Sequence, residues 1–197
     1  SYAKQGKDPR DFLQTYTGAV KALEILSAKT AGLGSINSTL DNDGIIRRVP
    51  LFVRLRTKGN FSSEVFPTLS VEALRVAQRA STYLLRSSGA SGDESFGENI
   101  GLQEIRVGRI KVPTTGAGQI WLHDTGHVPE RFISAIDVIE SQSLGPKIRG
   151  NIVLVGTSAS GLKDIRSTPL DPAIAGVEVH AMAIEQMMLG SHLTRPS

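Results

Sequence analysis

Residues 150–156 read Gly-Asn-Ile-Val-Leu-Val-Gly, an uninterrupted apolar run between turn-forming residues. A short run of this kind is typical of a strand that is buried on both faces, as in parallel sheets. Because parallel strands are joined by crossover connections, usually helices, the stretch predicts an α/β fold. Residues 152–155 are therefore expected to form a central strand.

Helical and strand patterns alternate along the rest of the chain. Residues 45–55 are β-like, and Pro50 within them predicts an edge strand or a break. Residues 67–84 carry an apolar side at helical spacing, and residues 177–189 predict a last helix that stops at Gly190. This alternation predicts an α/β fold with a mixed or mostly parallel central sheet flanked by helices.

Three further segments carry local signals. Residues 8–26 predict an amphipathic helix capped by Asp8, since apolar residues recur on one face. Residues 105–112 alternate in two short phases around Gly108, which predicts a bent strand or a tight hairpin. Residues 135–140 predict a helix that begins after a capping box.

The composition is that of an ordinary globular protein and excludes several kinds of chemistry. The 197 residues include 22 Lys and Arg, 19 Asp and Glu and no Cys, and the formal net charge is +3. Without cysteine the chain has no disulfide framework, thiolate zinc site or cysteine nucleophile. The basic residues are scattered, and so are the six Phe, three Tyr and one Trp, which disfavours a nucleic-acid partner. No apolar run approaches the about 18 residues of a membrane span.

The length of the chain suits one domain. We expect a single domain over residues 1–197, with a mobile loop at about residues 87–99, where Gly, Ser and acidic residues are frequent. The chain has no initiator Met and no hydrophobic signal segment at its start. It is therefore expected to be cut from a longer protein.

Residues 156–164 come close to a phosphate-binding loop but lack its chemistry. Such a loop needs Lys directly after its second Gly, followed by Ser or Thr for magnesium. Here Leu162 follows Gly161, and Asp164 stands where the hydroxyl is needed. Nucleotide triphosphate hydrolysis is therefore disfavoured. The position at the carboxyl end of the predicted strand is nevertheless where α/β sheets bind ligands.

Other short motifs do not support an enzyme or a metal site. Residues 124–126 (Asp-Thr-Gly) match the triplet of aspartic proteases, but that chemistry needs a second such Asp. His123 and His127 would share a face only on a helix, and Pro129 disfavours a helix there. We therefore assign no catalytic residue, no metal ligand and no cofactor.

Two groups of polar residues have more than one expected role. His180 lies on a predicted helix face with Ile184 and Met187, where a hydrogen-bonded core histidine is more common than a ligand or base. Arg47 and Arg48 follow an Asp-Asn-Asp-Gly turn and can pair with its carboxylates or meet an anionic ligand; pairing is the commoner use. The turn lacks the twelfth-position Glu of a calcium loop.

Several stretches have to be read together, in their order and spacing over about residues 33–196. They are Asp-Asn-Asp-Gly-Ile-Ile-Arg-Arg-Val-Pro-Leu at 41–51, Phe-Pro-Thr-Leu-Ser-Val-Glu-Ala-Leu at 66–74, Val-Pro at 112–113 with the glycine-rich turn to Ile120, residues 150–164, Thr-Pro-Leu at 168–170 and Gly-Val-Glu-Val-His-Ala at 176–181. Together they resemble the CHASE domains of type two, which are extracellular sensors of cyclases and histidine kinases. The family pattern usually begins with an earlier strand and a Trp-Pro-Trp-like segment. Either this first part has been removed here, or the N-terminal helix takes its place.

The resemblance implies a ligand-sensing domain in the periplasm, as the extracytoplasmic part of an inner-membrane protein. Flanking transmembrane helices would tether it to a cytoplasmic output such as an adenylate cyclase, a histidine kinase or a serine/threonine kinase. The resemblance implies no catalysis by the domain itself. The expected partners are a small-molecule ligand or a periplasmic protein, and we expect a homodimer.

The candidate ligand-binding residues lie mainly in the loop after residues 152–155. Chosen for loop position and hydrogen-bonding capacity, they are Thr157, Ser158, Ser160, Asp164 and Thr168, with His180 as a lesser candidate. Asp164 can equally cap or fix its own loop. The competing hypothesis is an α/β hydrolase or nucleotide-binding enzyme that uses residues 156–164. A third hypothesis is a module that only dimerises or contacts another protein.

Overall fold

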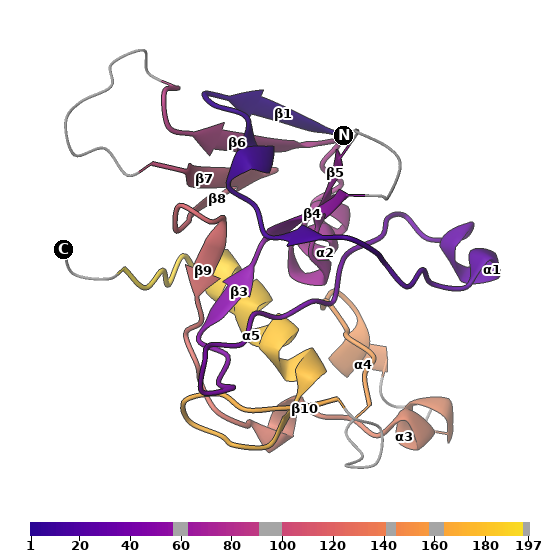
Figure 1. The fold of residues 1–197 in the computed structure, drawn as a ribbon. Helices are drawn as coiled ribbons and strands as arrows, with labels where there is room; N and C mark the ends of the chain where they lie inside the picture. The colour runs from indigo at the N-terminus through magenta and orange to yellow at the C-terminus, as the bar shows by residue number, and fades with distance from the viewer. Residues whose placement is uncertain (57–62, 91–99, 141–144, 158–163, 195–197) are drawn as a thin grey trace.

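The computed structural model describes residues 1–56, 63–90, 100–140, 145–157 and 164–194, and its largest sheet has four strands. The strands, in spatial order, are β1 (Tyr2–Gln5), β6 (Tyr83–Ser87), β7 (Leu102–Val107) and β8 (Ile110–Pro113) (Figure 1). Strand β1 is parallel to β6, and the other neighbours are antiparallel. With the helices described below, this mixed sheet confirms the predicted α/β class.

The turn between β7 and β8 is the tight hairpin predicted around Gly108. Val107 pairs with Ile110 across the turn, and Gly108 has φ +57°. Only glycine takes this left-handed conformation at little cost. The hairpin could be predicted because its determinant is local.

Seven further strands form three smaller sheets among the described residues. They are β2 (Thr15–Tyr16), β4 (Phe52–Arg56) and β5 (Ser63–Pro67) in one sheet, β3 (Arg48–Pro50) with β9 (Gln119–Trp121), and β10 (Ile165–Arg166) with β11 (Ile174–Ala175). The chain leaves one sheet at Pro50 and enters another at Phe52, which confirms the predicted break. Pro50 lacks an N–H for a ladder, so a strand cannot continue through it undisturbed.

Helices α2 (Leu69–Ala77) and α5 (Gly176–Leu189) contact each other and close the core against the sheets. The predicted helix over residues 67–84 is shorter in the structure, because Pro67 belongs to β5 and the chain turns at Arg79, which has φ +54°. The last helix matches its prediction, and Gly190 ends it in the left-handed conformation, φ +67°. The largest fully buried side chains include Phe52, Leu85 and Met187.

The predicted helix over residues 8–26 is wrong. Asp8 does accept a hydrogen bond from the Arg10 backbone N–H at 3.0 Å, but it caps only a 3₁₀ turn, Pro9–Asp11. Strand β2 then pairs in parallel with β4, and the next helix, α1, is only Glu24–Ser27. Pairing with a strand far along the chain overrides a helical pattern that contains β-branched residues and glycine.

The predicted central strand at residues 152–155 is also wrong. These residues belong to no sheet of the described chain; Ile152 and Leu154 pack against the core, whereas Val153 and Val155 are 54% and 93% exposed. A continuous apolar run does not reveal whether one or both of its faces are buried. Among the strand pairs of the described residues, β1–β6 and β2–β4 are parallel and the others are antiparallel, so the sheets take the mixed form of the two that were predicted.

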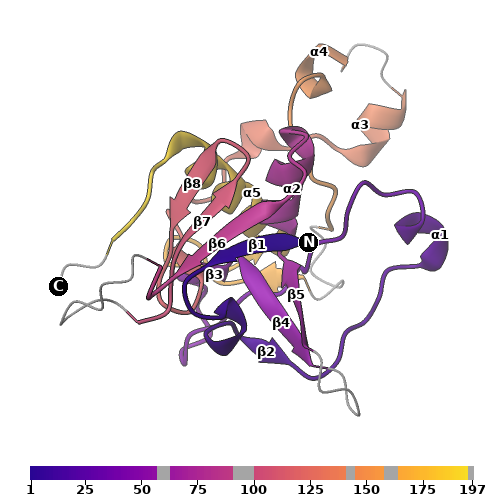
Figure 2. The ribbon, with the colours of Figure 1, turned by 90° about the horizontal axis from the view of Figure 1, so that it is seen from above.

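The remaining described elements are short. They are α3 (Ala135–Glu140), which matches its prediction, α4 (Gly145–Ile148) and a 3₁₀ turn, Pro129–Arg131. Figure 2 shows that α1 and the α3–α4 pair project from the body of the molecule. The predicted loop at 87–99 lies largely outside the described residues, and its first residue, Ser87, belongs to β6. None of the described helices is both long and apolar enough to cross a membrane.

Candidate functional site

Helix α5 positions most of the candidate residues that the structure describes. His180, Ile184 and Met187 are buried on one face, which confirms the predicted face. Glu178 and Glu185 lie on a different face and bind the side chains of residues 127 and 131, as described below. The helix therefore separates an internal contact surface from one that faces the segment after β9.

The described ends of the 156–164 segment both lie against the first turn of α5. A β-carbon at Gly156 would stand 2.5 Å from the Val177 Cβ, so these two residues are in close contact. The Asp164 carbonyl accepts a hydrogen bond from the Gly176 N–H at 2.8 Å, and the Asp164 carboxylate lies where a Gly176 side chain would begin. Glycine at 156 and 176 thus permits both described ends of the segment to lie against the helix.

The structure does not bring all the candidate residues together. Thr157 is exposed, and Ser158 and Ser160 lie outside the described residues. Thr168 is buried at the far end of the β10–β11 hairpin from Asp164. Its backbone N–H and hydroxyl both donate to the Asp171 carbonyl, at 2.7 and 3.2 Å. The hydrogen bonds of Thr168 therefore stabilise the turn at residues 168–171.

His180 is a buried, hydrogen-bonded histidine one turn into α5. Its Nδ1 lies 3.0 Å from the Ser70 hydroxyl on α2. Burial lowers the pKa of His180, while the backbone of Ile36 and the charge of Asp164 act in the opposite direction. Asp164 and His180 are thus close enough to interact, and the imidazole is held neutral in the core.

The lowered pKa of His180 predicts a loss of stability in acid. An unfolded histidine titrates near 6.5. Below that pH the unfolded chain binds more protons than the folded chain, so the free energy of unfolding falls as the pH falls. We expect a lower urea midpoint at pH 5.5 than at pH 7.5. The double variant His180→Leu with Ser70→Ala should have a smaller difference, and an unchanged difference would contradict the assignment.

The sequence interpretation missed a polar contact between α5 and the segment after β9. The Gln186 Oε1 accepts a hydrogen bond from the His123 N–H at 2.9 Å, and its Nε2 donates to the Trp121 carbonyl at 2.8 Å. The Glu178 carboxylate lies 2.8 Å from the His127 Nδ1. Helical spacing of these α5 residues indicates a shared face, but it does not identify what covers that face.

A small open pocket of about 160 Å³ lies beside this contact. Arg131 lines it and forms a bidentate ion pair with Glu185, at 2.9 and 3.0 Å. Its lining residues are His123, Thr125, Arg131, Met182, Glu185, Gln186, Leu189 and Ser191. Because its two charged groups neutralise each other, the pocket presents no unpaired charge to a ligand.

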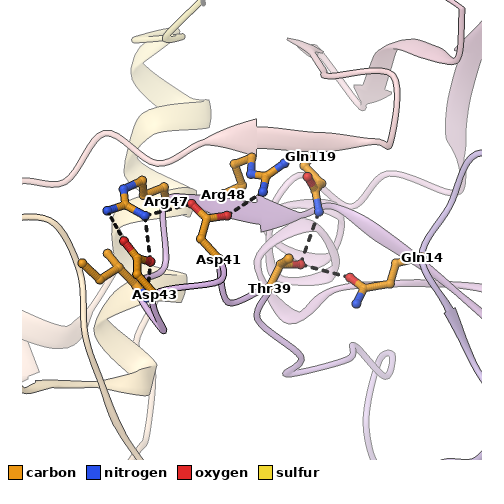
Figure 3. A network of polar contacts seen from close by, with 8 residues as sticks. Gln14, Thr39, Asp41, Asp43, Arg47, Arg48 and Gln119 are labelled. Atoms are coloured by element: carbon orange, nitrogen blue, oxygen red, sulfur yellow. Dashed lines mark hydrogen bonds and ion pairs between the residues drawn. The ribbon is translucent and has the colours of Figure 1, made fainter.

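A second polar network surrounds the turn at residues 41–44 (Figure 3). Arg47 pairs with Asp43 at 2.7 Å and with Asp41 at 3.0 Å, and Arg48 pairs with Asp41 at 2.5 Å. These pairs hold the pKa of both carboxyl groups below the usual range. The Arg48 guanidinium lies 5.4 Å from the ring centre of Trp121. Pairing within the turn, the commoner of the two expected roles, is confirmed.

The Asp-Thr-Gly triplet also has a structural role. The Asp124 carboxylate accepts hydrogen bonds from the backbone N–H groups of Gly126 and Leu170, at 2.9 and 2.8 Å. It therefore joins its own turn to the turn that contains Thr168. Among the described residues, no group of three or more His, Asp or Glu side chains could hold a metal ion.

The amino end of α5 is already occupied by acidic groups. The free N–H groups of a helix start carry partial positive charge and favour anions. Here the Asp164 carboxylate lies against Gly176, and the Glu178 Oε1 accepts a hydrogen bond from the Ala175 N–H at 3.2 Å. These carboxylates take the place that a phosphate would need.

Comparison with known protein families gives a match over nearly the whole chain. Residues 4–197 match the sequence model of the CHASE2 domain family. No curated protein and no solved structure matches the chain. The match covers nearly the whole chain, including α5 and the segment that docks on its first turn.

Proposed function

The chain belongs to the CHASE2 domain family, a family of extracellular sensory domains in signalling proteins, and from that premise we propose that it is the periplasmic ligand-sensing domain of a transmembrane receptor. Residues 1–197 act as one domain, and flanking transmembrane helices connect it to a cytoplasmic adenylate cyclase or kinase. The receptor works as a homodimer. The domain itself binds a small molecule or a periplasmic protein and performs no catalysis. The family match is the observation that carries this proposal.

The proposed binding site is the loop that docks on the amino end of α5. Thr157 and Asp164, at the described ends of this loop, supply hydrogen-bonding groups, and Ser158 and Ser160 stay candidates from the sequence alone because they lie outside the described residues. Asp164 suits this role because its carboxylate is only part-buried. It forms an ion pair with Arg166, 3.1 Å away. His180 lies close enough to interact with Asp164 but is buried, and Thr168 is buried in its own turn away from Asp164.

Helix α5 can carry a change at this site to the far end of the domain. Its 14 residues span about 21 Å. Beyond Gly190 the chain forms a bridge with β9 between Leu193 and Trp121. A ligand that binds one arrangement of loop and helix better than another shifts the equilibrium by its difference in affinity. That shift is the signal that we propose the receptor transmits.

The competing enzyme hypothesis is less well supported by the charges of the site. A nucleotide phosphate at the amino end of α5 would meet the Asp164 and Glu178 carboxylates. Repulsion between like charges at short range opposes such binding. A neutral polyol or an amine has no such conflict, and its hydroxyl or ammonium groups can donate to Asp164.

Thermal unfolding of the full chain with a panel of polyols, amines and Mg-ATP tests this proposal. A ligand at 100 times its Kd stabilises the folded state by about 2.7 kcal/mol, which raises the Tm of a domain of this size by about 5–10 °C. We expect such a shift from a neutral or cationic compound.

Two variants identify the site of that shift. Asp164→Asn should reduce it, whereas Asp137→Asn, a matched change of an exposed carboxylate on α3, should leave it unchanged. Saturable stabilisation by Mg-ATP that persists in Asp164→Asn would contradict both the site and its ligand class.

A further inference from the structure

The small pocket beside α5 lies away from the proposed binding site. On α5 it is lined by residues between Met182 and Leu189, whereas Asp164 lies against Gly176, the first residue of the helix. Figure 1 shows the carboxyl end of α5 beside β9. The pocket is lined by α5, by the segment after β9 and by Ser191, which follows the helix. A molecule bound there would contact all of these parts of the chain.

The pocket combines an apolar surface with polar side chains that have no protein partner. Within the part of the chain that the structure describes, the side chains of His123, Thr125 and Ser191 make no hydrogen bond. Each of them can donate a hydrogen bond and accept one. Met182 is buried in the wall of the pocket, and Leu189 is largely exposed at its side. Apolar walls with a few convergent polar groups are typical of small-molecule sites.

The charged groups of the pocket favour a ligand that carries both signs of charge. The Arg131 guanidinium and the Glu185 carboxylate contact each other in bidentate geometry. A simple anion on Arg131 would be repelled by Glu185, and a simple cation on Glu185 would be repelled by Arg131. A zwitterion avoids both conflicts, because its carboxylate binds the arginine and its ammonium binds the glutamate. Both side chains are more than one-third exposed, so separating this ion pair costs little.

The size of the pocket limits the zwitterion to a small molecule. The pocket has a volume of about 160 Å³, and a cavity of about 150 Å³ holds a molecule as large as benzene. An α-amino acid carries its carboxylate and its ammonium on a single carbon, so both charged groups fit a pocket of this size. An aliphatic side chain on that carbon can then cover Met182 and Leu189, which favours burial of its apolar surface.

We propose that this pocket binds a free α-amino acid with an aliphatic side chain. The ligand carboxylate replaces Glu185 as the bidentate partner of Arg131, and the ligand ammonium replaces Arg131 as the partner of Glu185. The hydroxyl groups of Thr125 and Ser191 supply further hydrogen bonds. The bound amino acid thus joins the turn Pro129–Arg131 to α5. This is a second ligand site, and it does not depend on the proposed sensor site at Asp164.

A series of three ligands tests the charge requirement. Isothermal titration of the full chain at neutral pH compares L-leucine with leucinamide, which lacks the carboxylate, and with isocaproate, which lacks the ammonium. We expect saturable binding of leucine and at least about 10-fold weaker binding of each analogue, because each loses one charge-assisted contact and faces one like charge. Binding of either analogue as tight as that of leucine, or no saturable leucine binding below about 10 mM, would overturn the proposal.

Arg131→Gln should reverse the preference between two of these ligands. Leucine should bind about 10-fold more weakly, because its carboxylate loses the guanidinium. Leucinamide should bind more tightly than it does to the wild type, because Glu185 then has no competing cation. A variant that merely loosened the segment would bind both ligands more weakly, and that result would overturn the proposal. Arg109→Gln, a matched change of an exposed arginine between β7 and β8, should leave both affinities unchanged.

The same measurements separate this pocket from the proposed sensor site. Asp164→Asn should leave leucine binding unchanged, whereas loss of leucine binding in that variant would place the ligand at the amino end of α5 and overturn the proposal. Arg131→Gln should keep any thermal shift that depends on Asp164. Leucine binding without a response that depends on Asp164 would count against the proposed sensor site and leave the pocket supported.

Discussion

Replacing Glu72 with alanine should cost about 3 kcal/mol of unfolding free energy, a large part of the stability of a typical domain. Glu72 lies on α2 and is only 7% exposed. Its carboxylate accepts two hydrogen bonds from Arg75, at 2.6 and 3.0 Å, and a further one from the Tyr83 hydroxyl. Removing it leaves the largely buried Arg75 guanidinium without its counter-charge, although the Ala31 and Ala80 carbonyls still accept from it, and leaves the buried Tyr83 hydroxyl without this acceptor.

Glu185→Ala is the matched control for this prediction. Glu185 also binds an arginine in bidentate geometry, but both side chains of that pair are more than one-third exposed. Water can replace the lost partner there, so the expected cost is about 0–1 kcal/mol. Urea unfolding followed by circular dichroism measures both variants. Similar losses in the two would show that burial does not set the strength of the Glu72 pair.

The elements that could be predicted from the sequence have local determinants. Glycine with positive φ sets the hairpin at Gly108 and the end of α5 at Gly190. Proline sets the break between β3 and β4 at Pro50. Arg47 and Asp43 are four residues apart, so their pairing could also be predicted from the local sequence.

The predictions that failed depend on partners far along the chain. Residues 15 and 16 form a strand because β4 lies beside them, and nothing within residues 8–26 indicates this. Residues 152–155 have the composition of a central strand, yet no strand of the described chain pairs with them. A continuous apolar run does not by itself indicate which strand, if any, will pair with it.

The candidate ligand-binding residues stay predictions, and the contacts around them show the same difference between local and distant partners. The docking of Asp164 on α5 follows from a short connection between the two, whereas the contact of Gln186 with the segment after β9 joins residues more than 60 positions apart. A buried glutamine in a helix offers no sign of which backbone groups it will bind. The buried role of His180 was accessible because Ile184 and Met187 share its helical face.

Replacing Gln186 with leucine should loosen the segment after β9 and cost about 2–3 kcal/mol of unfolding free energy. Leucine fills a similar volume but leaves the Trp121 carbonyl and the His123 N–H without the partners that Gln186 supplies. Trp121 is the single tryptophan of the chain, so its fluorescence reports on this place alone. We expect a red-shifted emission and stronger iodide quenching in the folded variant.

Gln14→Leu separates this effect from the general loss of a glutamine. Gln14 is exposed and accepts one hydrogen bond from Thr39, so its loss should change stability by less than about 0.5 kcal/mol. It should leave the Trp121 emission unchanged. Because Trp121 also forms a bridge with Leu193, the Gln186 variant tests whether α5 holds β9 and the residues beyond Gly190 together. If the Gln186→Leu variant keeps the wild-type emission and the wild-type free energy of unfolding, the bridge alone joins β9 to the residues beyond Gly190. That result would contradict the proposed role of α5 in transmitting a signal.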